Sequence, residues 1–235
     1  MVDNKRVPYL RQGDEFPPVS MSRADGLLAA GGDLGVDRLI EAYSNGIFPW
    51  YDERTPILWY SPLNRCLFIP SEFKASASLR QRLRNNPFHF TFDADFEQVI
   101  HHCANIKRKE DNGTWIVPDM TEAYIRLHRE GYAHSVEVWN GQRLAGGLYG
   151  VSLGRAFFGE SMFHLETDAS KAALYYLCKE LSAWNFLFID AQLSTAHLLS
   201  LGAITIPRSQ YLVLLKDALR QPSLKGSWKQ QIADD

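Results

Sequence analysis

The order of strand-like and helical patterns between residues 134 and 192 limits the fold of this chain most strongly. Two alternating apolar runs flank Asn140-Gly141, a dipeptide typical of a type I′ hairpin turn. A third strand-like run at 156–160 precedes a helical pattern over 169–184, and another apolar run follows at 188–192. A strand, a helix and a strand in succession place the two strands parallel, joined by a right-handed crossover. The pattern therefore predicts a mixed sheet.

Polar side chains end the two strands that flank this helix. Glu160 ends the first, and Asp190 and Gln192 end the second, where period-2 alternation puts them on one face. Burying such groups costs free energy unless they are paired, and ligands bind beyond the carboxyl ends of parallel strands. We therefore expect Glu160, Asp190 and Gln192 to mark a site.

The rest of the chain divides at about residue 66. A small N-terminal domain, 1–66, is rich in aromatic residues, Gly and Pro and contains one helix, 36–45, which Gly46 ends. The larger domain, 67–235, begins with a strand at 66–69. Its other expected elements are helices at 76–84 and 94–103, a strand at 88–92, a helix that begins at Pro118, a short helix at 195–201, a strand at 203–206 and a helix at 207–219. The residues from Gln221 onward are expected to fray.

Composition excludes several classes of protein. With 46% hydrophobic and 22% charged residues the chain is an ordinary globular protein, and its net charge of −2 requires any nucleic-acid contact to be local. Three cysteines without paired spacing fit a reducing compartment. The sequence has neither a signal-peptide pattern nor an apolar run long enough for a membrane span. His101-His102-Cys103 lacks partner ligands, so no metal is expected to bind there. Together these observations predict a cytoplasmic protein without membrane contact, metal or cofactor.

The element order is that of acyl-CoA N-acyltransferase-like (GNAT-like) enzymes, an α+β class, here with a small N-terminal domain. Those enzymes hold the cofactor pyrophosphate in a Gly-rich turn between the central strand and the long helix. Residues 160–168, interpreted as that turn, contain three acids and no glycine. The acyl donor is therefore not expected to be a CoA thioester.

Eight short runs in register resemble one known family, the bacterial leucyl/phenylalanyl-tRNA–protein transferases. They are GGDL at 31–34, GIFPW at 46–50, LWYSP at 58–62, GTWI at 113–116, HSVEVW at 134–139, GGLYGV at 146–151, GESMF at 159–163 and ASK at 169–171. Any one run is weak evidence, but eight in order over residues 10 to 220 are very specific.

The resemblance implies a cytoplasmic enzyme of the N-degron pathway. It would move Leu, Phe or, less well, Met from aminoacyl-tRNA to the α-amine of a protein that begins with Arg or Lys. Asp190, Gln192 and Glu160 match its catalytic positions. The positions expected to hold the aminoacyl-adenosine end of the donor are Trp50, Trp115, Leu148, Phe157, Gly159, Ser161 and Leu177. Leu177 departs from a family member that has Phe there, which bears on side-chain preference.

Each of these positions also has a plainer interpretation. The two tryptophans and the apolar positions could be ordinary core. Glu160 could cap the following helix, and Asp190 with Gln192 could be a buried polar pair that ties loops together. Lys74, Arg80 and Arg84, expected to bind tRNA, could be a solvated face. The alternative functions are a CoA-dependent N-acetyltransferase and a non-catalytic module that binds tRNA or peptides.

The predicted reaction is attack of an amine on an ester carbonyl by a monomeric enzyme. An α-amine has a pKa of about 8, so a useful fraction is neutral at pH 7 and positioning matters more than a strong base. Asp190 is expected to orient the amine and accept its proton, directly or through Gln192. Gln192 would hold the amine or the ester, and Glu160 would bind the amino-acid or ribose end of the donor.

Overall fold

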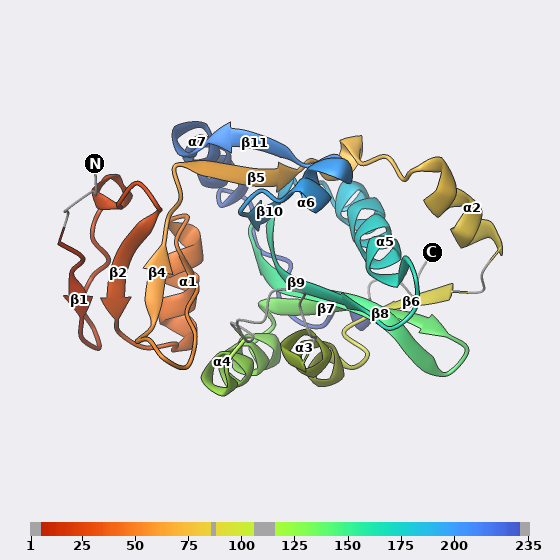
Figure 1. Cartoon of the computed structure of the whole chain (residues 1–235), viewed down its shortest axis with the longest axis horizontal. Helices are drawn as coiled ribbons and strands as arrows, with labels where there is room; N and C mark the ends of the chain where they lie inside the picture. Colours follow the sequence, from red (N-terminus) through yellow and green to blue (C-terminus); the bar gives the residue numbers. More distant parts are fainter. Residues whose placement is uncertain (1–5, 86–87, 106–115, 231–235) are drawn as a thin grey trace.

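Two β-sheets organise the chain, which a computed structural model describes over residues 6–85, 88–105 and 116–230 (Figure 1). The four-stranded sheet has the order β1–β2–β4–β3, and the seven-stranded sheet has the order β11–β5–β10–β9–β8–β7–β6. The strands of the first are β1 Tyr9–Leu10, β2 Leu27–Gly31, β3 Phe48–Pro49 and β4 Leu58–Tyr60. Those of the second are β5 Asn64–Phe68, β6 Phe88–Phe92, β7 Ala133–Asn140, β8 Arg143–Leu153, β9 Ala156–His164, β10 Phe188–Gln192 and β11 Ile204–Pro207.

Helices cover both faces of the larger sheet. Figure 1 shows α3 and α4 on one side of β7–β9 and α5 on the other, with α2 beyond α5. The helices are α1 Val36–Ser44, α2 Ala77–Asn85, α3 Phe96–Asn105, α4 Pro118–Arg129, α5 Ala169–Ala183, α6 Ala196–Ser200 and α7 Arg208–Ala218. Short 3₁₀ turns lie at Val19–Met21, Pro70–Glu72 and Trp228–Gln230.

The predicted strand order is confirmed. β7 and β8 form an antiparallel hairpin closed by the Asn140–Arg143 pair, and β8 pairs antiparallel with β9. β9 then pairs parallel with β10, and α5 is the crossover between them. This is the mixed α+β arrangement with a smaller N-terminal part that the sequence predicts. The domain boundary at residue 66 stays a prediction; the four-stranded sheet ends at Tyr60, and the seven-stranded sheet begins at Asn64.

β9 is longer than predicted, so Glu160 lies in the middle of a strand rather than at its end. The β8–β9 register shifts between Tyr149 and Gly150, and Glu160 is the extra residue of the resulting bulge. Gly150 permits this packing because a Cβ there would lie 2.5 Å from the Phe157 ring and 2.2 Å from a β9 carbonyl oxygen. The interpretation of residues 160–164 as part of a turn is therefore wrong, because they continue to pair with β8.

The C-terminal residues are docked rather than frayed, against the expectation from sequence. Trp228 is fully buried and stacks on His134 with ring centroids 3.7 Å apart. Its backbone N–H donates to the Asp93 carboxylate at 2.7 Å, and its ring lies 5.9 Å from that of Phe157. The tail therefore completes the core that packs around α5.

The hydrophobic core has two parts, one on each face of the larger sheet. The first joins α1, α3, α4 and the four-stranded sheet, and the second surrounds α5. Gly46 ends α1 as predicted, with φ +71°, and a Cβ there would lie 2.9 Å from the Tyr211 ring. This close approach brings the β3 segment against α7. No helix among the described residues is both long enough and apolar enough to cross a membrane.

Candidate active site

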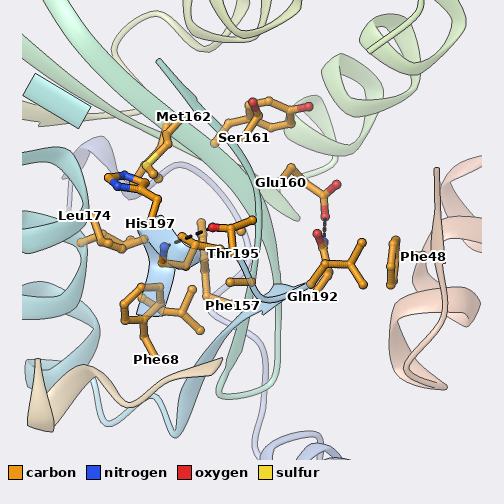
Figure 2. A pocket seen from close by; sticks show the side chains of 18 of the residues that line it. Phe48, Phe68, Phe157, Glu160, Ser161, Met162, Leu174, Gln192, Thr195 and His197 are labelled. Atoms are coloured by element: carbon orange, nitrogen blue, oxygen red, sulfur yellow. Dashed lines mark hydrogen bonds between the residues drawn. The ribbon is translucent and has the colours of Figure 1, made fainter. Parts of the chain in front are cut away.

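A largely apolar cavity of about 400 Å³ opens where β9 and β10 separate. The parallel pairing runs from Ala156–Phe188 to Phe158–Asp190 and then stops, so the strands diverge beyond that point. Side chains from β3, β8, α5 and α6 close the space (Figure 2). The lining residues are Phe48, Pro49, Trp50, Phe68, Leu148, Tyr149, Phe157, Gly159, Glu160, Ser161, Met162, Leu174, Leu177, Ile189, Ala191, Gln192, Leu193, Thr195, His197 and Leu198.

The structure brings together most of the residues that the sequence singles out. Those lining the cavity are Trp50, Leu148, Phe157, Gly159, Glu160, Ser161, Leu177 and Gln192. Asp190 lies behind the cavity wall rather than in it. Trp115 lies outside the described part of the chain. Lys74, Arg80 and Arg84 are exposed on or beside α2, away from the cavity, and their role in tRNA binding stays a prediction.

Glu160 shares a buried triangle of oxygens with two tyrosines. Tyr43 donates to Glu160 Oε1 at 2.7 Å and Tyr124 donates to Oε2 at 3.0 Å, while the two phenol oxygens are 2.5 Å apart. Burial, with the nearby carboxyl of Glu160, raises the pKa of both phenols well above 10, so each keeps its proton. Two phenol protons cannot serve three oxygen–oxygen contacts. When Glu160 is protonated it can donate to one phenol, which donates to the other, which in turn donates back to the carboxyl, so that all three contacts are satisfied.

Burial also raises the pKa of the Glu160 carboxyl to about 7, against the lowering effect of Tyr43, Tyr124 and Gln192. The carboxyl is only 8% exposed and has no cationic side chain hydrogen-bonded to it among the described residues. The hydrogen-bond pattern around Glu160 and its buried position therefore both favour a protonated carboxyl. Glu160 is a carboxyl that changes charge close to neutral pH, which is the range useful for proton transfer.

Gln192 is the polar group that faces Glu160 across the mouth of the β9–β10 split. Its side-chain Nε2 donates to Glu160 Oε1 at 2.9 Å, the dashed contact in Figure 2. Its backbone is left-handed, with φ +59°, where a non-glycine residue is strained. The β5–β10 register shifts between Asp190 and Gln192, so the simple alternation expected for these two side chains breaks. They consequently have different neighbours.

Asp190 is fully buried in an ion pair with Arg65, a residue that sequence reasoning missed. The guanidinium donates through Nε at 3.0 Å and through Nη2 at 2.8 Å, and Tyr211 donates its hydroxyl at 2.7 Å. The backbone N–H of Gln192 donates to Oδ1 at 2.8 Å. A carboxylate with these donors is poorly placed to take a proton from a ligand. The expected direct acceptor role of Asp190 does not fit, whereas a role through Gln192 does.

The charge of Arg65 is secured by the same contacts. Burial alone would lower the pKa of its guanidinium, but Asp190 and the other nearby oxygens outweigh that effect and raise it. The sequence gives one signal of this pair, a charged residue inside the apolar strand Asn64–Phe68.

Several other lining residues were missed by sequence reasoning. Leu174 could have been found, because it stands one turn before Leu177 on the same face of α5. Thr195 and His197 come from the short helix α6, whose position depends on contacts distant in sequence. No group of three or more His, Cys, Asp or Glu side chains able to hold a metal ion occurs within the described ranges.

Comparison with known proteins places this chain in one family. The family model described as leucyl/phenylalanyl-tRNA protein transferase matches residues 67–216, and the model of that family's N-terminal domain matches residues 32–63. A transferase of that name from Legionella pneumophila (strain Corby) is 53% identical over 213 residues, covering 91% of this chain and 95% of the relative. One from Syntrophobacter fumaroxidans is 52% identical over 225 residues, covering 95% and 96%.

A solved structure, that of L-PGS from Bacillus licheniformis, is far more remote. It has 11% sequence identity and a TM-score of 0.41, covering 72% of this chain and 53% of that chain, and contributes nothing to the assignment. Family membership is shown by the two family models and by relatives that share more than half of their aligned residues with this chain. The chain belongs to the leucyl/phenylalanyl-tRNA protein transferase family, whose members are transferase enzymes.

Proposed function

We propose that this chain moves Leu, Phe and, less well, Met from aminoacyl-tRNA to the α-amine of proteins that begin with Arg or Lys, and so marks them for the N-degron pathway. The observation that carries the proposal is a cavity with largely apolar walls into which the hydrogen-bonded Glu160–Gln192 pair faces. The aminoacyl ester of Leu, Phe or Met has matching polar and apolar parts, because its side chain is apolar while its ester and amine are polar. The cavity is large enough for one such side chain.

The proposed chemistry is direct transfer. The neutral fraction of the acceptor amine attacks the ester carbonyl, the new C–N bond forms, the C–O bond to the tRNA ribose breaks, and the proton lost by nitrogen ends on the ribose oxygen. Gln192 would hold the amine or ester, and Glu160 the amino-acid or ribose end of the donor. Asp190 would act through the Gln192 backbone that it holds. Proximity and orientation supply most of the acceleration, because an amine that is already partly neutral needs no strong base.

The donor's terminal adenosine would be held at the open edge of the cavity, and the tRNA body outside it. Trp50 lines the cavity yet is 41% exposed, which suits a platform for a base or an apolar side chain. Lys74, Arg80 and Arg84 are all exposed, so their charges are available to phosphates. Trp115 is proposed as the second aromatic contact on the basis of the family resemblance alone.

A CoA-dependent acetyltransferase is the alternative enzyme. The segment that connects β9 to the N-terminus of α5 carries Glu166 and Asp168 and no glycine. Two carboxylates at a helix N-terminus repel a pyrophosphate instead of binding it. We therefore favour an aminoacyl-tRNA donor. A non-catalytic binding module would leave the Glu160–Gln192 pair without a use.

The proposed setting is the cytoplasm, with a monomeric enzyme that needs no metal or cofactor. Cys66, Cys103 and Cys178 are all buried, in keeping with cysteines in the core of a protein from a reducing compartment. The proposed reaction needs one cavity for the aminoacyl end of the donor and a basic surface for the tRNA.

The test is a transfer assay with two donors and two acceptors. The purified chain is incubated with radiolabelled Leu-tRNA or radiolabelled acetyl-CoA, and with a peptide that begins with Arg or with the same peptide beginning with Ala. Label should pass only from Leu-tRNA and only to the Arg peptide. Label from acetyl-CoA would favour the acetyltransferase, and binding of Leu-tRNA without any transfer would favour the binding module.

A further inference from the structure

Arg65 of β5 connects the two parts of the cavity wall that come from different sheets. Its side chain is fully buried and does not line the cavity. Its guanidinium contacts Asp190 on one side and the carbonyl oxygen of Gly46 on the other, at 2.8 to 3.0 Å and 2.9 Å. One side chain thus spans from the strand that carries Gln192 to the segment that leads into β3.

On the first side, Arg65 controls the conformation of Gln192. Asp190 Oδ1 accepts the backbone N–H of Gln192, and this contact holds the residue in its left-handed conformation at φ +59°. Such a conformation costs about 1–3 kcal/mol and persists only when the surroundings impose it. The Asp190 carboxylate can impose it because Arg65 and Tyr211 fix both of its oxygens. The amide of Gln192 is thereby aimed at Glu160.

On the second side, Arg65 fixes the aromatic wall. Its guanidinium carbon lies 4.9 Å from the centre of the Phe48 ring and 4.5 Å from that of Tyr211. Phe48 begins β3, which leads directly to Trp50. Phe48 and Gln192 both line the cavity, and Figure 2 shows them on the same side of it, with Phe48 on the edge strand of the four-stranded sheet. One guanidinium therefore contacts both the Gln192 strand, through Asp190, and the Phe48 segment.

Stability alone does not require a charged pair at this place. Replacing a buried ion pair by apolar side chains of similar volume is often neutral or stabilising, whereas such pairs can specify a particular geometry. Lysine could match the charge of Asp190. The lysine ammonium is a compact point charge, however, whereas the planar fork of arginine presents donors in several directions and so reaches the carboxylate and the carbonyl on the opposite side at once.

We propose that Arg65 is a positioning residue for aminoacyl transfer, which sets Gln192 and the Trp50 segment at the separation that the reacting groups need. The inference rests on the proposed function. Arg65 touches no substrate in this account and acts only through Asp190, Gly46 and Phe48. Its loss should therefore lower the rate of the chemical step more than it lowers the folded fraction.

Arg38 provides a matched control for this proposal. It too is buried, and its guanidinium contacts a backbone carbonyl (Asp14), a carboxylate (Glu41) and an aromatic ring (Phe16). Neither Arg38 nor any of these three partners lines the cavity. Arg65→Lys and Arg38→Lys thus make the same chemical change at two buried guanidinium groups, one at the site and one away from it, although the carboxylate that pairs with Arg38 is 42% exposed.

The experiment measures the single-turnover rate of Leu transfer at saturating Leu-tRNA, thermal unfolding, and hydrogen exchange of the Gln192 backbone amide. Arg65→Lys should lower the rate about 10- to 100-fold, the scale of a misplacement of about 1 Å. It should also speed exchange of that amide, whereas Arg38→Lys should leave both near the parent values. Equal rates and equal exchange in the two variants would overturn the proposal, as would a rate loss that only follows the folded fraction.

A charge-free double variant, Arg65→Met with Asp190→Leu, separates positioning from stability. It should fold, lose the protection of the Gln192 amide and transfer Leu slowly. Parental rate and protection would overturn the proposal, and failure to fold would assign the pair a structural role and overturn it as well. The exchange measurement needs no transfer activity, so an inactive parent enzyme would count against the proposed function while the positioning of Gln192 could still be decided.

Discussion

Two buried carboxylates beside Gln192 have opposite kinds of partner. Asp190 is paired with the guanidinium of Arg65, while Glu160 is hydrogen-bonded only to neutral hydroxyl and amide groups among the described residues. The residue types alone do not distinguish the two, since both are acids in apolar strands. The difference comes from Arg65, Tyr43 and Tyr124, which are distant from these acids in the sequence and reach them only through the fold. Sequence could therefore nominate the acids but not their protonation.

The pH dependence of stability should reveal the proton on Glu160. Burial raises the pKa of its carboxyl from 4.5 to about 7, so between these values the native state holds a proton that the unfolded state releases. The native state is therefore destabilised as pH rises, by about 1.4 kcal/mol per unit at most in this window. Glu160→Gln lacks this loss. Urea unfolding at pH 5 and pH 8 should show the variant gaining stability relative to the parent at pH 8. Parallel changes would contradict the assignment.

Removing the charge of Asp190 should cost stability as well as activity. Asp190→Asn leaves the buried guanidinium of Arg65 without its counter-ion, a change that costs about 3–5 kcal/mol. Asp52→Asn is the matched control, because Asp52 pairs with Arg54 at the surface, where solvent screens the pair and little stability depends on it. Denaturant titrations of both variants check this. Equal losses would show that burial of the Arg65 pair has no energetic consequence.

At the scale of elements, local signals predict most helices and the hairpin. The Asn140-Gly141 turn, the Pro at the start of α4 and the Gly after α1 each act on their own neighbours, so a short window reveals them. The end of β9 cannot be predicted from a short window, because it depends on residues distant in the sequence. Its bulge at Glu160 depends on Gly150 and the Phe157 ring, which meet only when β8 and β9 pair.

The basic helix α2 should contribute to tRNA binding. Changing both Arg80 and Arg84 to Ala should weaken Leu-tRNA binding and reduce the slope of log affinity against log salt by about 0.9 for each phosphate that the two arginines neutralise. The control changes Arg126 and Arg129, two exposed arginines in the last turn of α4. Filter binding at several salt concentrations measures both. Identical slopes for the two double variants would make α2 an ordinary solvated face.

At the scale of the whole molecule, the C-terminal tail reaches back to support the cavity from behind. Trp228 packs against Phe157, which lines the cavity, and against Phe92, Trp184 and Phe186. The tail has no periodic apolar pattern, and all of these contacts are long-range, so its docking could not be predicted from the sequence. Most of the site residues expected in the cavity wall do line it. Five of them fall in the runs that carry the family resemblance (Trp50, Leu148, Gly159, Glu160 and Ser161), whereas Phe157, Leu177 and Gln192 lie outside those runs.

Two tryptophans should differ in what is lost when each is replaced by alanine: stability for Trp228 and transfer activity for Trp50. Trp228→Ala removes a fully buried ring and should lower the free energy of unfolding by about 3–5 kcal/mol. Trp50→Ala removes a ring that is 41% exposed at the cavity, and should lower transfer activity with a smaller loss of stability. Calorimetry with a transfer assay compares them. A stable Trp228→Ala protein would show that the docked tail is dispensable.

The most direct test of the account is the rate of single-turnover transfer from Leu-tRNA and from Ile-tRNA to one Arg-initiated peptide, by the parent and by Gln192→Ala. Ile is branched at Cβ and Leu is not, and the cavity walls should reject the additional branch. Leu should therefore transfer about 10- to 200-fold faster than Ile. Gln192→Ala should lower both rates by about 100-fold or more and leave their ratio unchanged, because it alters the reacting end and not the side-chain pocket. Equal rates for Leu and Ile in the parent, or full activity of a folded Gln192→Ala, would contradict the account.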